Sequence, residues 1–222
     1  MIATVKKQLP RRLKAPVRQA IKAVKYRWRR YRIAAPVARG DPLKIIVGAA
    51  ETWQKGWYST NEDWLDITKE EDWRAVFEGK RIITHVLAEH VFEHLTHDEC
   101  RIALTHIGGH MKKGGRIRIA VPDGYHPDSD YLRHVGIDGI GDDAADHKQL
   151  LNVDTLGALL IEAGFQPSHI EGYDSLGRLV CKTYSVEDGL IHRSRANATP
   201  NSASRWGFVD ADTSLIVDGV KV

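Results

Sequence analysis

Short apolar runs alternate with segments of helical periodicity along most of the chain, and this alternation restricts the fold more than any other feature. Residues 44–48, 81–89 and 116–121 are rich in Ile, Val and Leu and have the length of buried strands. Residues 96–111 and 156–163 repeat apolar side chains at helical spacing. The alternation predicts an α/β sandwich around a mostly parallel sheet, in which ligands bind beyond the carboxyl ends of the strands.

Length and composition point to one globular domain. The 222 residues, of which 42% are hydrophobic, suffice for one sizeable core. No run approaches the roughly 18 consecutive apolar residues of a membrane span, and no apolar segment of the secretory-signal type follows the N-terminus. Two cysteines, Cys100 and Cys181, are too few for a disulfide framework or a four-cysteine zinc site. We therefore expect a cytoplasmic protein.

The first 40 residues differ in charge from the rest of the chain. They contain 13 Lys and Arg and no Asp or Glu, so residues 41–222 hold the other 19 basic residues against 29 acidic ones. This asymmetry predicts a basic N-terminal arm, 1–40, attached to an acidic main domain, 41–222. Apolar side chains recur in the arm at helical steps, which predicts an amphipathic helix that begins near Pro16 and ends before Pro36. The stripe consists of Val17, Ile21, Val24, Trp28 and Tyr31.

Two interpretations of the arm remain open. Lys and Arg around an aromatic-bearing stripe suit an anionic membrane surface, which for a cytoplasmic protein is the inner face of the membrane. Alternatively, the stripe packs on the main domain or on a second copy of the chain in a homo-oligomer, and the charges stay in water. Nucleic acid is a disfavoured partner because the main domain is acidic and would repel a polyanion.

Three segments, in order along the chain, resemble class I S-adenosylmethionine-dependent methyltransferases, and most closely a compact bacterial group of that family. They are AEHVFEHL at 88–95, KKGGRIRIAVPDGYHPD at 112–128 and EAGF at 162–165. The resemblance spans roughly residues 42–222 and leaves the basic arm outside. It implies a Rossmann-like sandwich, with a mostly parallel seven-stranded sheet, helices on both faces, and S-adenosylmethionine across the ends of the first strands.

The resemblance assigns cofactor contacts to residues at the ends of three strands: Gly48, Ala49, Ala50, Asn61, Asp66, Glu89 and His90. The turn after the first strand has one glycine where the family has two or three, and two small alanines follow it. Asn61 stands where the family usually has an acid that holds the ribose hydroxyls, and its amide can still form hydrogen bonds with hydroxyls. Asp66 matches a family position near the adenine, or else it caps the following helical turn.

Three further residues are candidate catalytic bases: His94, Asp123 and His147. His94 follows the strand at 81–89, Asp123 follows the strand at 116–121, and His147 precedes the next predicted helix. A histidine or carboxylate base assists transfer to oxygen, so we expect methyl transfer to a hydroxyl of a small molecule or glycan. Each of these side chains can equally serve to hold its own loop in place. This interpretation includes no resident metal.

Two other functions stay open at this point. Residues 90–94 fit the H-x-x-E-H pattern of inverted zinc peptidases, in which His90 and His94 would bind zinc from one helix face with Glu93 as the base. A distant acid such as Glu171 would complete that zinc site. The single glycine of the first turn and Asn61 are also compatible with a domain that binds the cofactor without catalysis.

Overall fold

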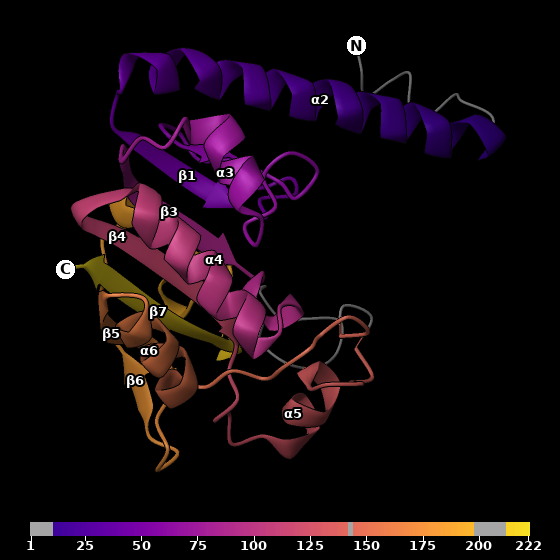
Figure 1. Cartoon of the computed structure of the whole chain (residues 1–222). Coiled ribbons are helices and arrows are strands. Elements are labelled where there is room, and N and C mark those ends of the chain that lie inside the picture. The colour runs from indigo at the N-terminus through magenta and orange to yellow at the C-terminus, as the bar shows by residue number, and fades with distance from the viewer. Residues whose placement is uncertain (1–10, 142–143, 198–211) are drawn as a thin grey trace.

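Seven strands form one mixed sheet in the computed structural model, which describes residues 11–141, 144–197 and 212–222 (Figure 1). The strands are β1 (Leu43–Val47), β2 (Tyr58–Ser59), β3 (Ile83–Glu89), β4 (Met111–Pro122), β5 (Phe165–Tyr173), β6 (Leu179–Cys181) and β7 (Ser214–Lys221). Their spatial order is β2-β1-β3-β4-β7-β5-β6. Strands β1 to β5 run in one direction, and β7 lies antiparallel between β4 and β5. The predicted seven-stranded, mostly parallel sheet is confirmed.

Helices connect these strands. The described helices are α2 (Arg11–Arg39), α3 (Glu70–Phe77), α4 (His97–His110), α5 (Ser129–Val135) and α6 (Val153–Glu162), with single 3-10 turns at η1 (Phe92–His94), η2 (Val186–Asp188) and η3 (Arg195–Asn197). The start of α4 is a capping box. The hydroxyl of Thr96 accepts from the N–H of Glu99 at 3.2 Å, and the Glu99 carboxylate accepts from the N–H of Thr96 at 2.7 Å. This box places the beginning of α4 directly after the η1 turn.

The main core lies on one face of the sheet, beneath four α-helices. Successive residues of a strand point to opposite faces, so Ile45 and Val47 of β1 belong to this core while Ile46 faces the other way. The helical side chains in the core include Tyr26, Ile33 and Val37 of α2, Trp73 and Phe77 of α3, Leu104 and Ile107 of α4, and Leu156 and Leu160 of α6. Burial of these side chains fixes the four helices against the sheet.

An irregular segment, residues 182–197, covers the opposite face of the sheet. Ile191 packs there in a smaller core with Leu87 and Ile216, and Tyr184 lies against the edge of that core. No α-helix among the described residues contributes a side chain to it, and the segment itself contains only the short turns η2 and η3. Where the sequence predicts helices on both faces, one face is therefore covered mainly by irregular chain.

Buried polar side chains of the sheet hold this segment in place. Arg118 of β4 is 1% exposed and pairs with both carboxylate oxygens of Asp218, at 2.7 and 2.9 Å. The same guanidinium donates to the backbone carbonyls of Ser185 and Gly189, and it lies 4.2 Å from the ring centroid of Tyr184. Irregular backbone cannot pair all of its N–H and C=O groups within itself, so side chains of the sheet form hydrogen bonds with them.

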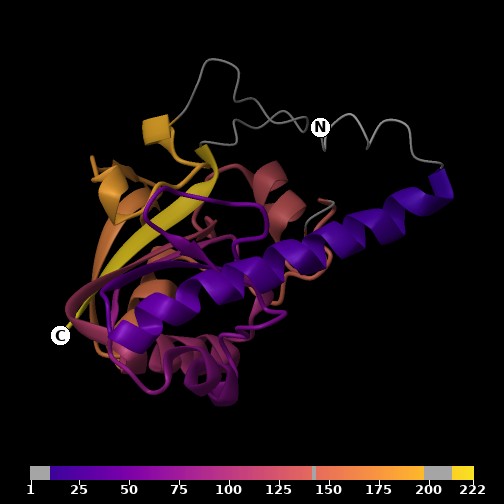
Figure 2. The same cartoon turned by 90° about the horizontal axis from the view of Figure 1, so that it is seen from above.

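Helix α2 is longer than the sequence predicts and packs through a different face. It continues through Pro36 to Arg39, because a proline near the end of a helix removes only one hydrogen bond before the helix stops. Tyr26, Ile33 and Val37 enter the main core. The predicted stripe, called the α2 stripe below, faces solvent instead: Ile21, Val24, Trp28 and Tyr31 are 39%, 71%, 56% and 78% exposed. The side chain of Val17 lies outside those that the structure describes. Figure 2 shows the N-terminal end of α2 projecting beyond the sheet.

Candidate cofactor and acceptor site

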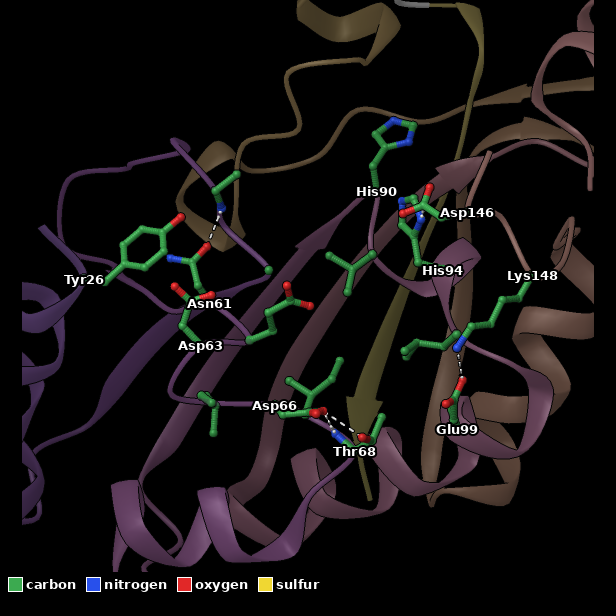
Figure 3. A pocket seen from close by; sticks show the side chains of 17 residues that line it. Tyr26, Asn61, Asp63, Asp66, Thr68, His90, His94, Glu99, Asp146 and Lys148 are labelled. Carbon is green, nitrogen blue, oxygen red and sulfur yellow. Dashed lines mark hydrogen bonds and ion pairs between the residues drawn. The ribbon is translucent and has the colours of Figure 1, made fainter. Parts of the chain in front are cut away.

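A cavity of about 470 Å³ opens at the carboxyl ends of β1, β2 and β3. This is the edge at which a parallel sheet offers its ligand sites. The residues predicted from the sequence that line the cavity are Gly48, Ala50, Asn61, Asp66, His90 and His94. Figure 3 shows Asn61 on one side of the cavity and His90 and His94 on the other. The structure therefore brings segments from the ends of β1, β2 and β3 to one place, whereas Glu89 and the loop after β4 do not line the cavity.

The turn after β1 gives the cavity a wall of bare backbone. Gly48 has a φ of +56°, and a Cβ at this position would lie 2.6 Å from Cγ2 of Val91. Glycine fits because it has no side chain and adopts left-handed backbone without strain. Ala50 also has a positive φ, 42°, and such strain is typical of functional sites. Ala49 instead packs in the smaller core on the opposite face, so its side chain does not line the cavity.

Asn61 connects the end of β2 with this turn. Its Oδ1 accepts a hydrogen bond of 2.8 Å from the N–H of Ala50. Its Nδ2 is buried and has no hydrogen-bond partner among the described residues. A buried amide donor without a partner is costly until an acceptor reaches it. Asn61 can therefore bind a hydroxyl or another oxygen atom of a ligand in the cavity.

Asp66 lines the cavity and also caps a turn. One carboxylate oxygen accepts from the N–H and the hydroxyl of Thr68, at 3.0 and 2.7 Å, and the other pairs with Lys69 at 3.0 Å. Burial by itself would raise the pKa of Asp66, but the hydrogen bonds from Thr68 and Lys69 hold this pKa below its ordinary value. The side chain is thus a fixed carboxylate, and the capping role that the sequence left open is present.

The two residues at the end of β3 have different roles. Glu89 does not line the cavity; its Oε1 accepts from the N–H groups of His192 and Arg193 at 2.8 and 2.9 Å and anchors the irregular segment. His90 does line the cavity, with a φ of +55° and an N–H that donates to the carbonyl of Ala120 at 2.8 Å. The Nε2 of His90 is buried and unpartnered within the described chain, so it is available to a ligand.

The three candidate bases do not meet at one point. His94 lines the cavity, and the ring of His147 lies beside it, with 4.9 Å between the ring centroids. Asp123 lies apart from the cavity, because its two carboxylate oxygens accept from the N–H groups of Tyr125 at 2.9 Å and Tyr173 at 2.7 Å. Burial raises the pKa of Asp123 although these two bonds oppose the shift. Asp123 connects the loop after β4 to β5, and this position favours a structural role over a catalytic one.

Two residues of the basic arm border the cavity, which the apolar stripe did not indicate. Tyr26 of α2 lines it (Figure 3), and Nη1 of Arg29 donates a hydrogen bond of 2.8 Å to the carbonyl of Ala50. The sequence does contain a second set of apolar residues at helical spacing, because Tyr26 shares a helix face with Ile33 and Val37. The stronger periodicity of the exposed stripe concealed it.

The H-x-x-E-H residues do not form the helix that an inverted zinc peptidase needs. His90 has left-handed backbone, and Phe92–His94 form only the single 3-10 turn η1. Glu93 lies 2.8 Å from Nδ1 of His90 rather than standing free as a base. Glu171, the candidate distant ligand, accepts from the hydroxyl of Ser194 on the opposite face of the sheet. The geometry therefore gives no support to a zinc peptidase.

Comparisons with known proteins concern the fold. No family model matches the chain, and a search of curated proteins also finds no match. A SAM-dependent methyltransferase from Archaeoglobus fulgidus is 17% identical with a TM-score of 0.47, over 92% of this chain and 94% of that one. An O-methyltransferase family protein from Burkholderia thailandensis is 10% identical with a TM-score of 0.48, over 92% and 59%. A 16S rRNA (adenine(1408)-N(1))-methyltransferase from Catenulisporales acidiphilia is 14% identical with a TM-score of 0.44, over 87% and 93%.

Proposed function

We propose that the protein transfers the methyl group of S-adenosylmethionine to an oxygen atom of a small-molecule or glycan acceptor. The observation that supports this most directly is the cavity at the ends of β1, β2 and β3, where bare backbone, an unpartnered amide and two histidines meet. Bound there, the cofactor would supply an electrophilic methyl group, whose bond to sulfur breaks as its carbon bonds to the acceptor oxygen and the hydroxyl proton leaves.

The residues around the cavity fit such a cofactor. Gly48 leaves open a space in which any Cβ would meet Val91, so the backbone after β1 can approach the amino-acid part of a ligand. The Nδ2 of Asn61 offers a donor to a ribose hydroxyl. Leu65 and Ile67 line the same cavity and offer apolar surface to an adenine ring.

His94 is the side chain best placed to act on the acceptor hydroxyl. It lines the cavity, and an imidazole nitrogen can accept the proton of a hydroxyl within hydrogen-bond reach. Its Nδ1 lies 3.1 Å from a carboxylate oxygen of Asp146, at an angle outside the range of a hydrogen bond. The imidazole therefore has a nearby carboxylate that can orient it and remains free to bind the acceptor.

The charge of the cavity supports a neutral acceptor over nucleic acid. Five acidic side chains line it, against one lysine and no arginine among the lining residues that the structure describes; the five are Glu62, Asp63, Asp66, Glu99 and Asp146. Carboxylates at this density repel phosphate groups. A small alcohol or a sugar hydroxyl carries no such charge and suits this lining.

Calorimetric titration of the purified chain tests the cofactor assignment. We expect S-adenosylmethionine and S-adenosylhomocysteine to bind at one site per chain. Asn61→Ala removes a donor to the ligand and the hydrogen bond that holds Ala50, so affinity should fall about tenfold or more, given roughly 0.5–1.5 kcal/mol for each hydrogen bond. Asn152→Ala is the matched control, because its amide caps α6 outside the cavity and its loss should leave affinity unchanged. The proposal fails if neither compound binds the wild-type chain.

We also propose that the α2 stripe contacts an anionic membrane surface. Arg27 and Arg32 are exposed and flank the stripe, and the guanidinium of Arg32 lies 4.8 Å from the ring centroid of Trp28. Helix α2 contains no acidic residue. Cations around exposed apolar side chains match anionic headgroups above an acyl layer. None of the described helices combines the length and the hydropathy that crossing a bilayer requires.

Replacing Trp28 and Tyr31 together by Ser is expected to weaken binding to phosphatidylserine-containing vesicles by about tenfold or more. A tenfold change is about 1.4 kcal/mol, which burial of roughly 60 Å² of apolar surface supplies. Wild-type binding should also weaken as salt rises, because each Lys or Arg near the surface contributes about 1 kcal/mol through screened charge. Co-sedimentation at two salt concentrations measures both effects.

The control for this experiment is Leu176→Ser, which removes an apolar side chain that is 73% exposed on a different part of the chain. Equal sedimentation of the wild type and the double α2 variant would contradict the membrane proposal. Point variants are preferable to deletion of the arm, because Tyr26 and Arg29 of the same helix border the cavity.

A further inference from the structure

We propose that Glu93, His94 and His147 form a binding site for one divalent transition-metal ion beside the cofactor cavity. One potential ligand atom from each residue lies within 4.8 Å of the other two. Two imidazoles and one carboxylate are a donor set that zinc and related ions use in sites with a further position open to substrate. The methyltransferase interpretation of the sequence included no resident metal. The zinc-peptidase alternative paired His94 with His90 and not with His147.

The strongest observation is the state of the Glu93 carboxylate. Glu93 is 1% exposed, and its Oε1 lies 2.8 Å from Nδ1 of His90. Its Oε2 is buried and has no hydrogen-bond partner in the described part of the chain. A desolvated carboxylate needs compensation at both oxygens, and unpartnered buried oxygens are uncommon. A cation at Oε2 supplies the missing compensation.

His147 is oriented as a metal-binding histidine usually is. Its Nδ1 lies 2.7 Å from the carbonyl oxygen of Val135, which can only accept a hydrogen bond, so Nδ1 is the donor and Nε2 is the nitrogen with the lone pair in the neutral imidazole. A bond of this kind fixes the tautomer and ring direction of many metal ligands. The His147 side chain is largely buried and its ring stands edge-on to that of His94, at an interplanar angle of 75°.

Backbone and side-chain contacts hold the two halves of this site together, although they are far apart in the sequence. The N–H of Lys148 donates to the carbonyl of Glu93 at 2.8 Å. The amide of Gln149 donates to the carbonyl of Leu95 at 2.7 Å, and Lys148 pairs with Glu99 at 2.8 Å. The segment that carries His147 is thus fixed to the η1 turn, and such a supporting frame is what a preorganised ligand set requires.

The position of the site gives the ion a role in the reaction, and this consequence rests on the proposed function. His94 lines the cavity (Figure 3), so an ion that it binds lies at the cavity wall. A divalent cation there holds a hydroxyl oxygen of the acceptor and lowers the pKa of that hydroxyl. The released proton passes to solvent, which the cavity meets at the 78% exposed side chain of Asp146. His94 then acts as a ligand, and the ion activates the hydroxyl.

Zinc titration of the chelator-treated chain tests the site without any methyl transfer. With zinc chloride and a competing chromophoric chelator, we expect one ion per chain at submicromolar affinity, and much weaker binding of magnesium because two ligands are nitrogen. Glu93→Gln and His94→Ala should each weaken zinc binding at least about 100-fold. His97→Ala removes an exposed histidine three positions from His94 and should bind zinc as the wild type does.

His94→Ala is the decisive variant, because its side chain is 32% exposed and the fold should survive its removal, as circular dichroism will check. Cobalt added to the metal-free chain should give visible absorption bands that this variant loses. Failure of the wild type to bind zinc, or unchanged binding in both Glu93→Gln and His94→Ala, would overturn the proposal. Calorimetry with S-adenosylmethionine on the metal-free chain separates these results from failure of the proposed function, because Glu93 does not line the cofactor cavity.

Discussion

Gly48→Ala is expected to abolish measurable binding of S-adenosylmethionine and to destabilise the fold. Its Cβ would lie 2.6 Å from Cγ2 of Val91, and a φ of +56° costs an alanine about 1–2 kcal/mol. Val91 leads into the η1 turn, so relief of this clash displaces the wall of the cavity. We expect affinity to fall at least about 100-fold by calorimetry, equivalent to about 2.7 kcal/mol. The melting temperature should fall by roughly 4–8 °C for a stability loss of about 2 kcal/mol.

Ala50→Gly is the matched control two residues away. It keeps the backbone N–H and carbonyl that bond to Asn61 and Arg29, and it relieves a φ of +42°. That relief, about 1 kcal/mol, offsets the similar cost of ordering a glycine, so stability should stay within about 0.5 kcal/mol of the wild type. Cofactor affinity should change by less than about threefold. If Gly48→Ala binds the cofactor as tightly as Ala50→Gly does, the cavity described here is not the cofactor site.

Arg118→Met is expected to lower the free energy of unfolding by about 3–5 kcal/mol. It removes two charge-assisted hydrogen bonds from the carboxylate of Asp218, which is 1% exposed, and leaves Arg116, at 3.1 Å, as its cationic partner. It also removes the donor to the carbonyls of Ser185 and Gly189, which hold the irregular segment against the sheet. Equilibrium unfolding in urea, followed by circular dichroism, measures the change.

Two controls separate this effect from a general loss of charge. Replacing Arg118 by Met together with Asp218 by Leu should recover much of the stability, because exchange of a whole buried ion pair for apolar groups is often neutral. Arg178→Ala breaks an exposed pair with Asp174 at 2.7 Å and should cost no more than about 1 kcal/mol. A loss below about 1 kcal/mol in Arg118→Met would show that the segment does not depend on this anchor.

The strand ends could be predicted because local sequence determines them. A strand buried on both faces is a continuous apolar run that stops at a turn residue, as at Gly48 and Pro122. The carboxyl ends of neighbouring parallel strands then meet at one edge, which is why Gly48, Asn61 and His90 line one cavity. Of the candidate bases, His94 lines this cavity, whereas Asp123 also follows a strand but is held away from it by the N–H groups of Tyr125 and Tyr173.

Contacts between distant segments could not be predicted. His147 meets Glu93 through a backbone hydrogen bond from Lys148, and no local pattern encodes that register. Arg118 alternates with apolar neighbours as an exposed strand residue would, yet the irregular segment near residue 185 buries it. In α2 the predicted apolar stripe exists, but the face that carries Tyr26 is the one that packs in the core. Periodicity identifies a helix face and leaves open which surface that face will meet.

Helix α2 gives the molecule a mechanical link between two surfaces. Its inner side brings Tyr26 to the cavity and Arg29 to the carbonyl of Ala50, while Trp28 and Tyr31 point outward. If a ligand that binds at the turn of Ala50 changes the tilt of α2, the outer side changes with it, because both sides belong to one helix. Thermodynamic reciprocity then requires that attachment of the outer side alter the affinity of the cavity by the same factor. Ligand binding in the cavity and binding of α2 to a membrane surface would then be coupled, so that each changes the other.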